Sequence, residues 1–194
     1  MWSNAVQVHP WVGSNFEAPK HFPRKTLLLG ESNFTKPELF SESLVQDCVK
    51  GDISDHSSSR DTTGFCRFST KIRRILFGGG EFIEPCDLWG DVAFYNFVQF
   101  LVGGQSRIRP TQEMWAKSVP AFSEIVQKLN PQQILVLGKE NWKNLLNHIE
   151  HERIDEYAAT LKVGSNRIKA VYINHPSSSL SYSKWQPIAK RILV

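Results

Sequence analysis

Four short apolar runs, separated by segments too long to be hairpin turns, constrain the fold of this 194-residue chain most strongly. The runs span residues 26–29, 91–95, 133–137 and 168–173. Runs of this length, bounded by Gly, Pro or polar residues, are typical of strands that are buried on both faces of a parallel sheet. We therefore expect an α/β domain whose sheet is mainly parallel and has helices on both faces.

The segments between these runs have helical periodicity. One of them carries apolar residues at the i, i+3, i+4, i+7 spacing of a helix that buries one face: Phe122, Ile125, Val126 and Leu129. Asn130 and Pro131 then form a stop signal. A second helix is expected after Gly138. A third is expected over residues 183–194, with Pro187 in its first turn, where proline is tolerated.

Two stretches are predicted to be loops. Residues 51–60 are polar and rich in helix breakers, and residues 78–80 are three consecutive glycines. Neither is long enough to link two domains, and 194 residues suit one domain with a substantial core. We therefore predict a single domain over residues 1–194 and a monomeric protein.

The charged residues suggest two classes of surface. The formal net charge is only +4, but basic residues form local clusters. One cluster contains Arg67, Lys71, Arg73 and Arg74, and the other contains Arg107 and Arg109. Clusters of this kind fit a polyanionic partner or a solvated helix face equally well.

Cysteine and histidine spacing argues against metal chemistry. The three cysteines are far apart, which favours a reducing compartment and falls short of the four thiolates of an iron–sulfur cluster. His148 and His151, the only close histidine pair, lie in a charged stretch. The chain has no apolar stretch of transmembrane length, and its first residues do not resemble a signal peptide. We expect a cytoplasmic protein without metal, cofactor or membrane partner.

Polar residues mark the ends of three of the four apolar runs. In chain order these motifs are Gly30-Glu31-Ser32-Asn33-Phe34, Phe94-Tyr95-Asn96 and His175-Pro176-Ser177. Sites in open α/β sheets form where the carboxyl ends of the strands meet. A carboxylate, Glu31, and an imidazole, His175, are therefore expected to face one cleft.

In their order and spacing, these motifs resemble the uracil-DNA glycosylase superfamily. That family has a Gly-x-Asp-Pro-Tyr or Gly-Glu-x-Pro-Gly motif after its first strand, an Asn at the end of its second strand and a His-Pro-Ser motif near its C-terminus. The resemblance covers residues 27–182. It implies a three-layer α/β/α sandwich around a four-stranded parallel sheet. It also implies a monofunctional DNA glycosylase that flips out and excises uracil or a modified pyrimidine from duplex or single-stranded DNA.

The resemblance assigns roles to three of these residues. His175 would donate a hydrogen bond to the negative charge that develops on the base O2, unless it is a structural histidine. Glu31 would position water or stabilise the cationic sugar, or else cap the next helix. Ser32 and Asn33 stand where the family has Asp and Pro. Asn96 would read the Watson–Crick edge of a pyrimidine, or else close a loop by a hydrogen bond.

Further residues are predicted to contact the base and the DNA backbone. Phe34 would stack on the base, where the family has a gating Tyr, or would be a core aromatic. Ser177, Ser178 and Ser179 offer hydroxyl and backbone N–H groups to phosphates. Leu180 follows one residue later than the intercalating Leu of the family, and we expect it to be a wedge rather than a core contact.

Two other functions compete with base excision. A nucleotide hydrolase is disfavoured because the chain has neither Gly-x-Gly-x-x-Gly nor Gly-x-x-x-x-Gly-Lys-Ser/Thr. A non-catalytic nucleic-acid-binding module stays open, with Ser32 and Asn33 marking lost chemistry. The same two residues favour a larger or more polar base than uracil, such as the modified pyrimidines of bacteriophage DNA. The protein would then serve defence rather than repair, although Phe34 could block substituents at the pyrimidine C5.

Overall fold

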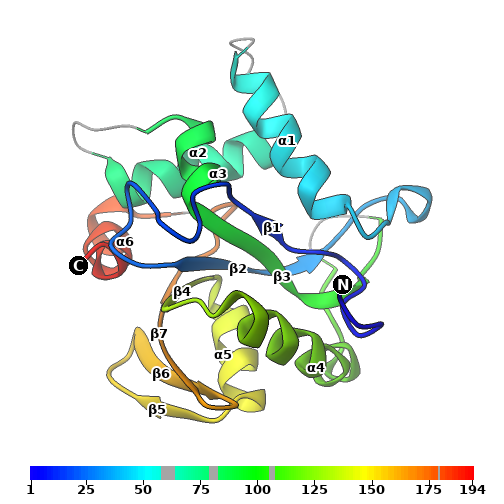
Figure 1. Ribbon diagram of the computed structural model, residues 1–194. Helices are drawn as coiled ribbons and strands as arrows, with labels where there is room; N and C mark the ends of the chain where they lie inside the picture. The colour runs from blue at the N-terminus through cyan, green and yellow to red at the C-terminus, as the bar shows by residue number, and fades with distance from the viewer. Residues whose placement is uncertain (58–63, 79–82, 105–107, 179) are drawn as a thin grey trace.

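The computed structural model describes residues 1–57, 64–78, 83–104, 108–178 and 180–194. Within these ranges the chain forms a mixed α/β structure in which helices lie on both faces of a seven-stranded sheet (Figure 1). The strands are β1 Trp11–Val12, β2 Thr26–Asn33, β3 Val92–Leu101, β4 Gln133–Leu137, β5 His151–Arg153, β6 Ala158–Val163 and β7 Asn166–Ile173. The helices are α1 Leu44–Ser57, α2 Gly64–Phe77, α3 Pro85–Asp91, α4 Gln112–Leu129, α5 Lys139–His148 and α6 Tyr182–Ala189, with short 3-10 helices η1 Pro37–Leu39 and η2 Lys190–Ile192.

The sheet is parallel in its centre and antiparallel at its edges. The strand order is β1-β3-β2-β4-β7-β6-β5, and the four central strands are parallel neighbours. The predicted parallel pairing is therefore confirmed, but the expectation of four strands is wrong. Three more strands pair antiparallel at the edges. They lack long apolar runs, because β1 has two residues, β5 has three and β6 buries only alternate residues at its end.

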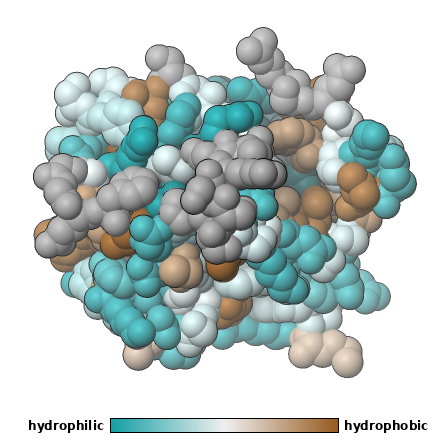
Figure 2. All heavy atoms as spheres, turned by 90° about the horizontal axis from the view of Figure 1, so that it is seen from above, coloured by the Kyte–Doolittle hydropathy of each residue, from teal (hydrophilic) through white to brown (hydrophobic). Residues whose placement is uncertain are grey.

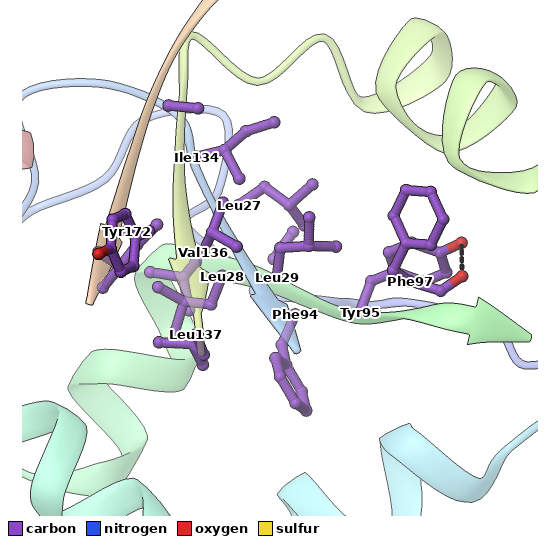
Figure 3. Packing of buried hydrophobic residues seen from close by; sticks show 14 of the residues in the cluster. Leu27, Leu28, Leu29, Phe94, Tyr95, Phe97, Ile134, Val136, Leu137 and Tyr172 are labelled. Atoms are coloured by element: carbon purple, nitrogen blue, oxygen red, sulfur yellow. Dashed lines mark hydrogen bonds between the residues drawn. The ribbon is translucent and has the colours of Figure 1, made fainter. Parts of the chain in front are cut away.

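Side chains of the central strands fill a core on each face of the sheet. Phe94 points to the opposite face from Tyr95 and Phe97 (Figure 3). The Phe94 ring contacts aromatic rings of α2 and α3, whereas the Phe97 ring contacts those of α4. In Figure 1, α1, α2 and α3 lie above the sheet and α4 and α5 lie below it. α6 packs against α2 and β7. Burial on both faces explains why the central strands read as continuous apolar runs.

β2 and β3 extend further than the sequence pattern predicts. β2 continues to Asn33, and β3 begins at Val92 and runs to Leu101. Asp91, predicted to start the strand, is the last residue of α3. Parallel pairing of the two strands continues past their apolar runs. The polar motif residues Glu31 and Asn96 therefore lie within strands rather than after them.

The predicted loop at residues 51–60 is wrong over the part that the structure describes, because α1 continues to Ser57. Val45, Val49 and Asp52 are buried at helical spacing, and Trp89 Nε1 donates a 2.6 Å hydrogen bond to the Asp52 carboxylate. These tertiary contacts outweigh the breaker-rich composition of the segment. Residues 58–60 and 79–80 of the two predicted loops lie outside the described residues.

The helices predicted from apolar spacing are confirmed as α4, α5 and α6. Asn130 ends α4 in the left-handed conformation, with φ of 46°, as its stop signal indicated. Pro187, however, lies inside α6 and not in its first turn. Both Pro187 and Ser183, whose carbonyl loses its helical partner, are exposed, so water can satisfy that carbonyl.

The surface over α1, α2 and α3 is largely hydrophilic. Figure 2 views the molecule from this side, and its hydrophobic residues form small groups separated by hydrophilic ones. No helix in the described ranges combines the length and the apolar character that a membrane crossing requires.

Asp91 fastens the N-terminal segment to the start of β3. Its carboxylate accepts hydrogen bonds from the backbone N–H groups of Lys20 and His21, at 2.7 and 2.5 Å, and from Asn15 Nδ2. We expect Asp91→Ala to lower the free energy of unfolding by about 2–3 kcal/mol, the range for hydrogen bonds to a charged group. His21→Ala removes only the ring contact and should cost less than about 1 kcal/mol. Urea denaturation measures both, and equal losses would contradict this role.

Candidate functional site

The register of the central strands brings the predicted site residues to one edge of the sheet. One continuous row crosses these strands: Tyr95, Leu29, Val136 and Tyr172. In the next row Asn96 of β3 lies opposite Gly30 of β2. Glu31 follows directly, and His175 lies two residues beyond Ile173, the end of β7. Polar groups therefore gather where the apolar rows end.

Glu31 is paired with an arginine. Its carboxylate is 10% exposed and accepts hydrogen bonds from Arg109 Nη1 at 2.9 and 3.1 Å, whereas the Arg109 side chain is 67% exposed. The next helix, η1, has no side-chain cap, so Glu31 is not the cap that one interpretation of the sequence proposed. The guanidinium neutralises a buried carboxylate and can itself be reached from solvent.

Asn96 bonds to the end of the neighbouring strand. Its Nδ2 donates to Asn33 Oδ1 at 2.8 Å, and Asn33 Nδ2 donates to the Val98 carbonyl at 3.2 Å. Asn96 Oδ1 lies directly over Gly30, where the Cβ of any other residue would overlap with it. Glycine at position 30 therefore leaves the space that the Asn96 amide occupies. The bond joins two strands and does not close a loop.

The loop after β7 is folded around His175. The Ser177 backbone N–H donates to His175 Nδ1 at 3.1 Å, and Ser178 donates from its N–H and its Oγ to the His175 carbonyl. Because Nδ1 is an acceptor, a neutral ring carries its proton on Nε2. The ring packs at 5.6 Å from the ring of Phe68 on α2.

The His175 imidazole is neutral near pH 7. Burial, followed by the positive charges of Arg109 and Lys71, lowers the pKa of His175 from 6.5 to about 4. A neutral imidazole with its proton on Nε2 donates a hydrogen bond without bringing a charge of its own. Such a donor can stabilise negative charge that develops on an oxygen during a reaction.

A hollow of about 220 Å³ lies beside His175, between α2 and the loop after β7. Its lining residues are Gly64, Arg67, Phe68, Lys71, Pro176 and Ser177. Two cations and a serine hydroxyl in one hollow suit a phosphate group. Arg73, from the same sequence cluster, is instead buried and donates to the Ile83 carbonyl and to Thr70 Oγ1. Arg107, from the second cluster, lies outside the described residues.

The other predicted contact residues differ in exposure. Phe34 is 59% exposed, so the interpretation as a core aromatic is wrong. Ser177 and Ser178 are exposed, but their backbone N–H groups already bond to His175. Ser179 lies outside the described residues. Leu180 is half-buried and packs against the hydrophobic core, and its role as a wedge stays a prediction.

Two residues connect the parts of the site. Arg109 pairs with Glu31 and also lies close enough to His175 to lower its pKa. The Phe68 ring contacts both the His175 ring and the ring of Phe94, at 5.6 and 6.0 Å. An added Cβ at Gly30 would reach the Phe94 ring as well as Asn96, so the polar residues of β2, β3 and β7 border one region.

Sequence reasoning missed Asn33, Phe68 and Arg109 as members of the site. Arg109 was visible only as part of a basic cluster, because a pair that joins residues 78 positions apart leaves no local pattern. Phe68 follows from packing alone. Asn33 did carry a signal, since a polar amide after a buried strand needs a partner.

The described residues contain no group of three or more His, Cys, Asp or Glu side chains that could hold a metal ion. The cysteines are separate, with Cys66 buried, Cys48 half-buried and Cys86 exposed. The chemistry assigned below therefore uses only the side chains already described.

No family model matches this sequence, and a search of curated proteins also finds no match. The likeness to the uracil-DNA glycosylase superfamily accordingly stays a hypothesis. It depends on the three motifs and on the arrangement of their side chains.

We expect His175 to titrate near pH 4 in an NMR titration of the imidazole carbons. Lys71→Ala and Arg109→Ala should each raise this pKa, because each removes a positive charge that opposes protonation. The effect of Arg109→Ala should be larger, since it also leaves the Glu31 carboxylate without its partner. Lys143→Ala, at an exposed position of α5, is the control and should leave the pKa unchanged. Titration of wild type near 6.5 would refute the assigned environment.

Proposed function

We propose that this protein is a monofunctional DNA glycosylase that excises uracil or a modified pyrimidine. The observation that carries the proposal is the neutral, Nε2-protonated imidazole of His175 beside a hollow lined by Arg67 and Lys71. Leaving-group stabilisation at a base and phosphate binding next to it are the two tasks that excision from DNA requires.

In this proposal His175 acts on the departing base. The N-glycosidic bond breaks, its electron pair leaves with the base, and water adds to C1′ of the sugar. Negative charge that develops on the base O2 accepts a hydrogen bond from His175 Nε2. Because the neutral imidazole has a pKa of about 4, it stabilises this charge by hydrogen bonding rather than by full proton transfer.

The target nucleotide must leave the base stack before it reaches His175. Asn96 would then contact the Watson–Crick edge of the base, and the exposed Phe34 would stack on it. Arg67, Lys71 and the Ser177 hydroxyl would bind flanking phosphates.

Glu31 has a role only when its carboxylate is released from Arg109. A DNA phosphate can compete for the exposed guanidinium of Arg109, and Glu31 could then position water or stabilise the cationic sugar. The same ion pair favours the second candidate function, a nucleic-acid-binding module without catalysis. In that case Arg109 keeps the only carboxylate among the proposed site residues neutralised.

The substrate class follows from the first motif. Ser32 and Asn33 stand where efficient uracil enzymes of the family supply Asp and Pro, so a modified pyrimidine is the favoured base and defence against bacteriophage the favoured role. A panel of uracil-containing and hypermodified DNAs at equal enzyme concentration decides between these bases. Fast uracil excision without action on modified DNA would return the protein to uracil repair.

Base release from this panel tests the enzyme. His175→Ala should lower the rate by about 100- to 1000-fold, the usual effect of losing one donor to a developing oxyanion. His151→Ala is the matched control, because this ring bonds to the Ile149 carbonyl on β5 and contacts no site residue among those described. The thermal melting temperature of both variants should stay near that of wild type.

Three outcomes would count against a monofunctional glycosylase. Full activity of His175→Ala would remove the imidazole from the mechanism. A covalent adduct trapped by borohydride would indicate lyase chemistry at an amine such as Lys71. Tight DNA binding without release of any base would support the binding module instead.

Duplex binding should depend on salt through the hollow. If Arg67 and Lys71 each meet one phosphate, the double variant Arg67→Ala/Lys71→Ala should lower the slope of log K against log salt by about 1.8, or about 0.9 for each phosphate contact. Fluorescence anisotropy at several salt concentrations measures this slope. Lys143→Ala/Arg153→Ala removes the same charge from exposed positions on α5 and β5 and should leave the slope unchanged. Equal changes in both double variants would exclude a local phosphate site.

A further inference from the structure

Asn33 holds the Asn96 amide through an oriented chain of hydrogen bonds. The Val98 carbonyl can only accept, so the Asn33 amide must turn its Nδ2 toward it. Asn33 Oδ1 then faces Asn96 and accepts from Asn96 Nδ2 at 2.8 Å. One backbone carbonyl therefore sets the direction of two side-chain amides.

This chain fixes which atom Asn96 presents. Because Asn96 Nδ2 is turned toward Asn33, Asn96 Oδ1 is the atom that lies over Gly30. Within the described residues this oxygen accepts no hydrogen bond, and Asn33 is 4% exposed. If the Asn96 amide rotated by 180°, its Oδ1 would face Asn33 Oδ1, and two acceptors would oppose each other. The lock therefore acts in one direction only.

We propose that Asn33 is a specificity-determining residue, which fixes Asn96 so that an acceptor oxygen is presented to the base. The inference rests on the proposed base excision. It selects pyrimidines that carry a hydrogen-bond donor on the Watson–Crick edge, either the ring N3–H of uracil or the N4 amino group of cytosine derivatives. A base that offers only acceptors on this edge leaves Asn96 Oδ1 unpaired and is rejected.

Asn33→Leu and Asn33→Asp form a matched pair. Leucine fills a similar volume but accepts nothing, so Asn96 is free to rotate. Aspartate still offers an oxygen to Asn96 Nδ2, so the orientation of Asn96 is kept. Asn144→Leu is the control, because Asn144 also donates to a carbonyl, that of Glu140, and accepts from an amide, that of Gln112, in a pair that contains no site residue.

The first measurement is direct and needs no substrate. The Asn96 side-chain amide protons are identified in NMR spectra by their disappearance in Asn96→Asp. In wild type, Asn33→Asp and Asn144→Leu, one of these protons should be protected from exchange with water. In Asn33→Leu its exchange should be at least about tenfold faster, the effect of losing one hydrogen bond. Equal exchange in wild type and Asn33→Leu would overturn the lock.

The second measurement is base discrimination. Oligonucleotides carry a single deoxyuridine, 5-hydroxymethyldeoxycytidine or 2-pyrimidinone deoxyriboside, and the last of these bases has acceptors only. The release rate of each donor-bearing base is divided by that of 2-pyrimidinone, and the ratio is compared between variants so that intrinsic bond reactivity cancels. This ratio should fall by about tenfold or more in Asn33→Leu and be kept in Asn33→Asp and Asn144→Leu.

The two measurements separate the possible failures. If wild type releases none of the three bases, base excision itself is refuted, and amide exchange still decides whether Asn33 orients Asn96. If wild type releases a base but the ratio is the same in Asn33→Leu, Asn33 does not determine specificity. Faster release of 2-pyrimidinone than of both other bases by wild type would also overturn the inference.

Discussion

β2 pairs with β3 on one side and with β4 on the other, and both pairings are parallel. Parallel neighbours need long crossover connections, and these connections supply the helices on the two faces of the sheet. The same pairing makes the central strands end at one edge, where Gly30 of β2 lies level with Asn96 of β3. A shift of one residue would turn Asn96 to the other face of the sheet. The candidate site therefore depends on backbone register before it depends on any polar contact.

The centre of this fold could be predicted from the sequence because its strands are buried on both faces. Residues 133–137 are all buried, and such a run leaves a clear apolar pattern. The edge strands leave none, since β1 contains only two residues. α1 was missed for another reason, because its second half is held by the contact between Asp52 and Trp89, which are 37 positions apart. Local propensity cannot show a contact of this kind.

The candidate site divides in the same way. The positions of Glu31, Asn96 and His175 follow from strand ends, which the sequence marks well. Their electrostatic state does not, because the neutral form of His175 depends on burial and on Arg109, which enters from the loop between β3 and α4. Hydrogen-bond direction is also a property of the folded chain: the orientation of Asn96 depends on a carbonyl two residues further along the same strand, through a side chain of the next one.

The antiparallel strands at the two edges have a consequence for self-association. An exposed sheet edge offers unpaired backbone groups to a strand of another molecule, and long flat edges promote aggregation. Here the outermost strands, β1 and β5, have two and three residues. A second copy that tried to extend the sheet could form only a few backbone hydrogen bonds at either side. The strongly pairing apolar strands are thus kept in the interior, and the ends of the sheet are poor templates for fibril growth.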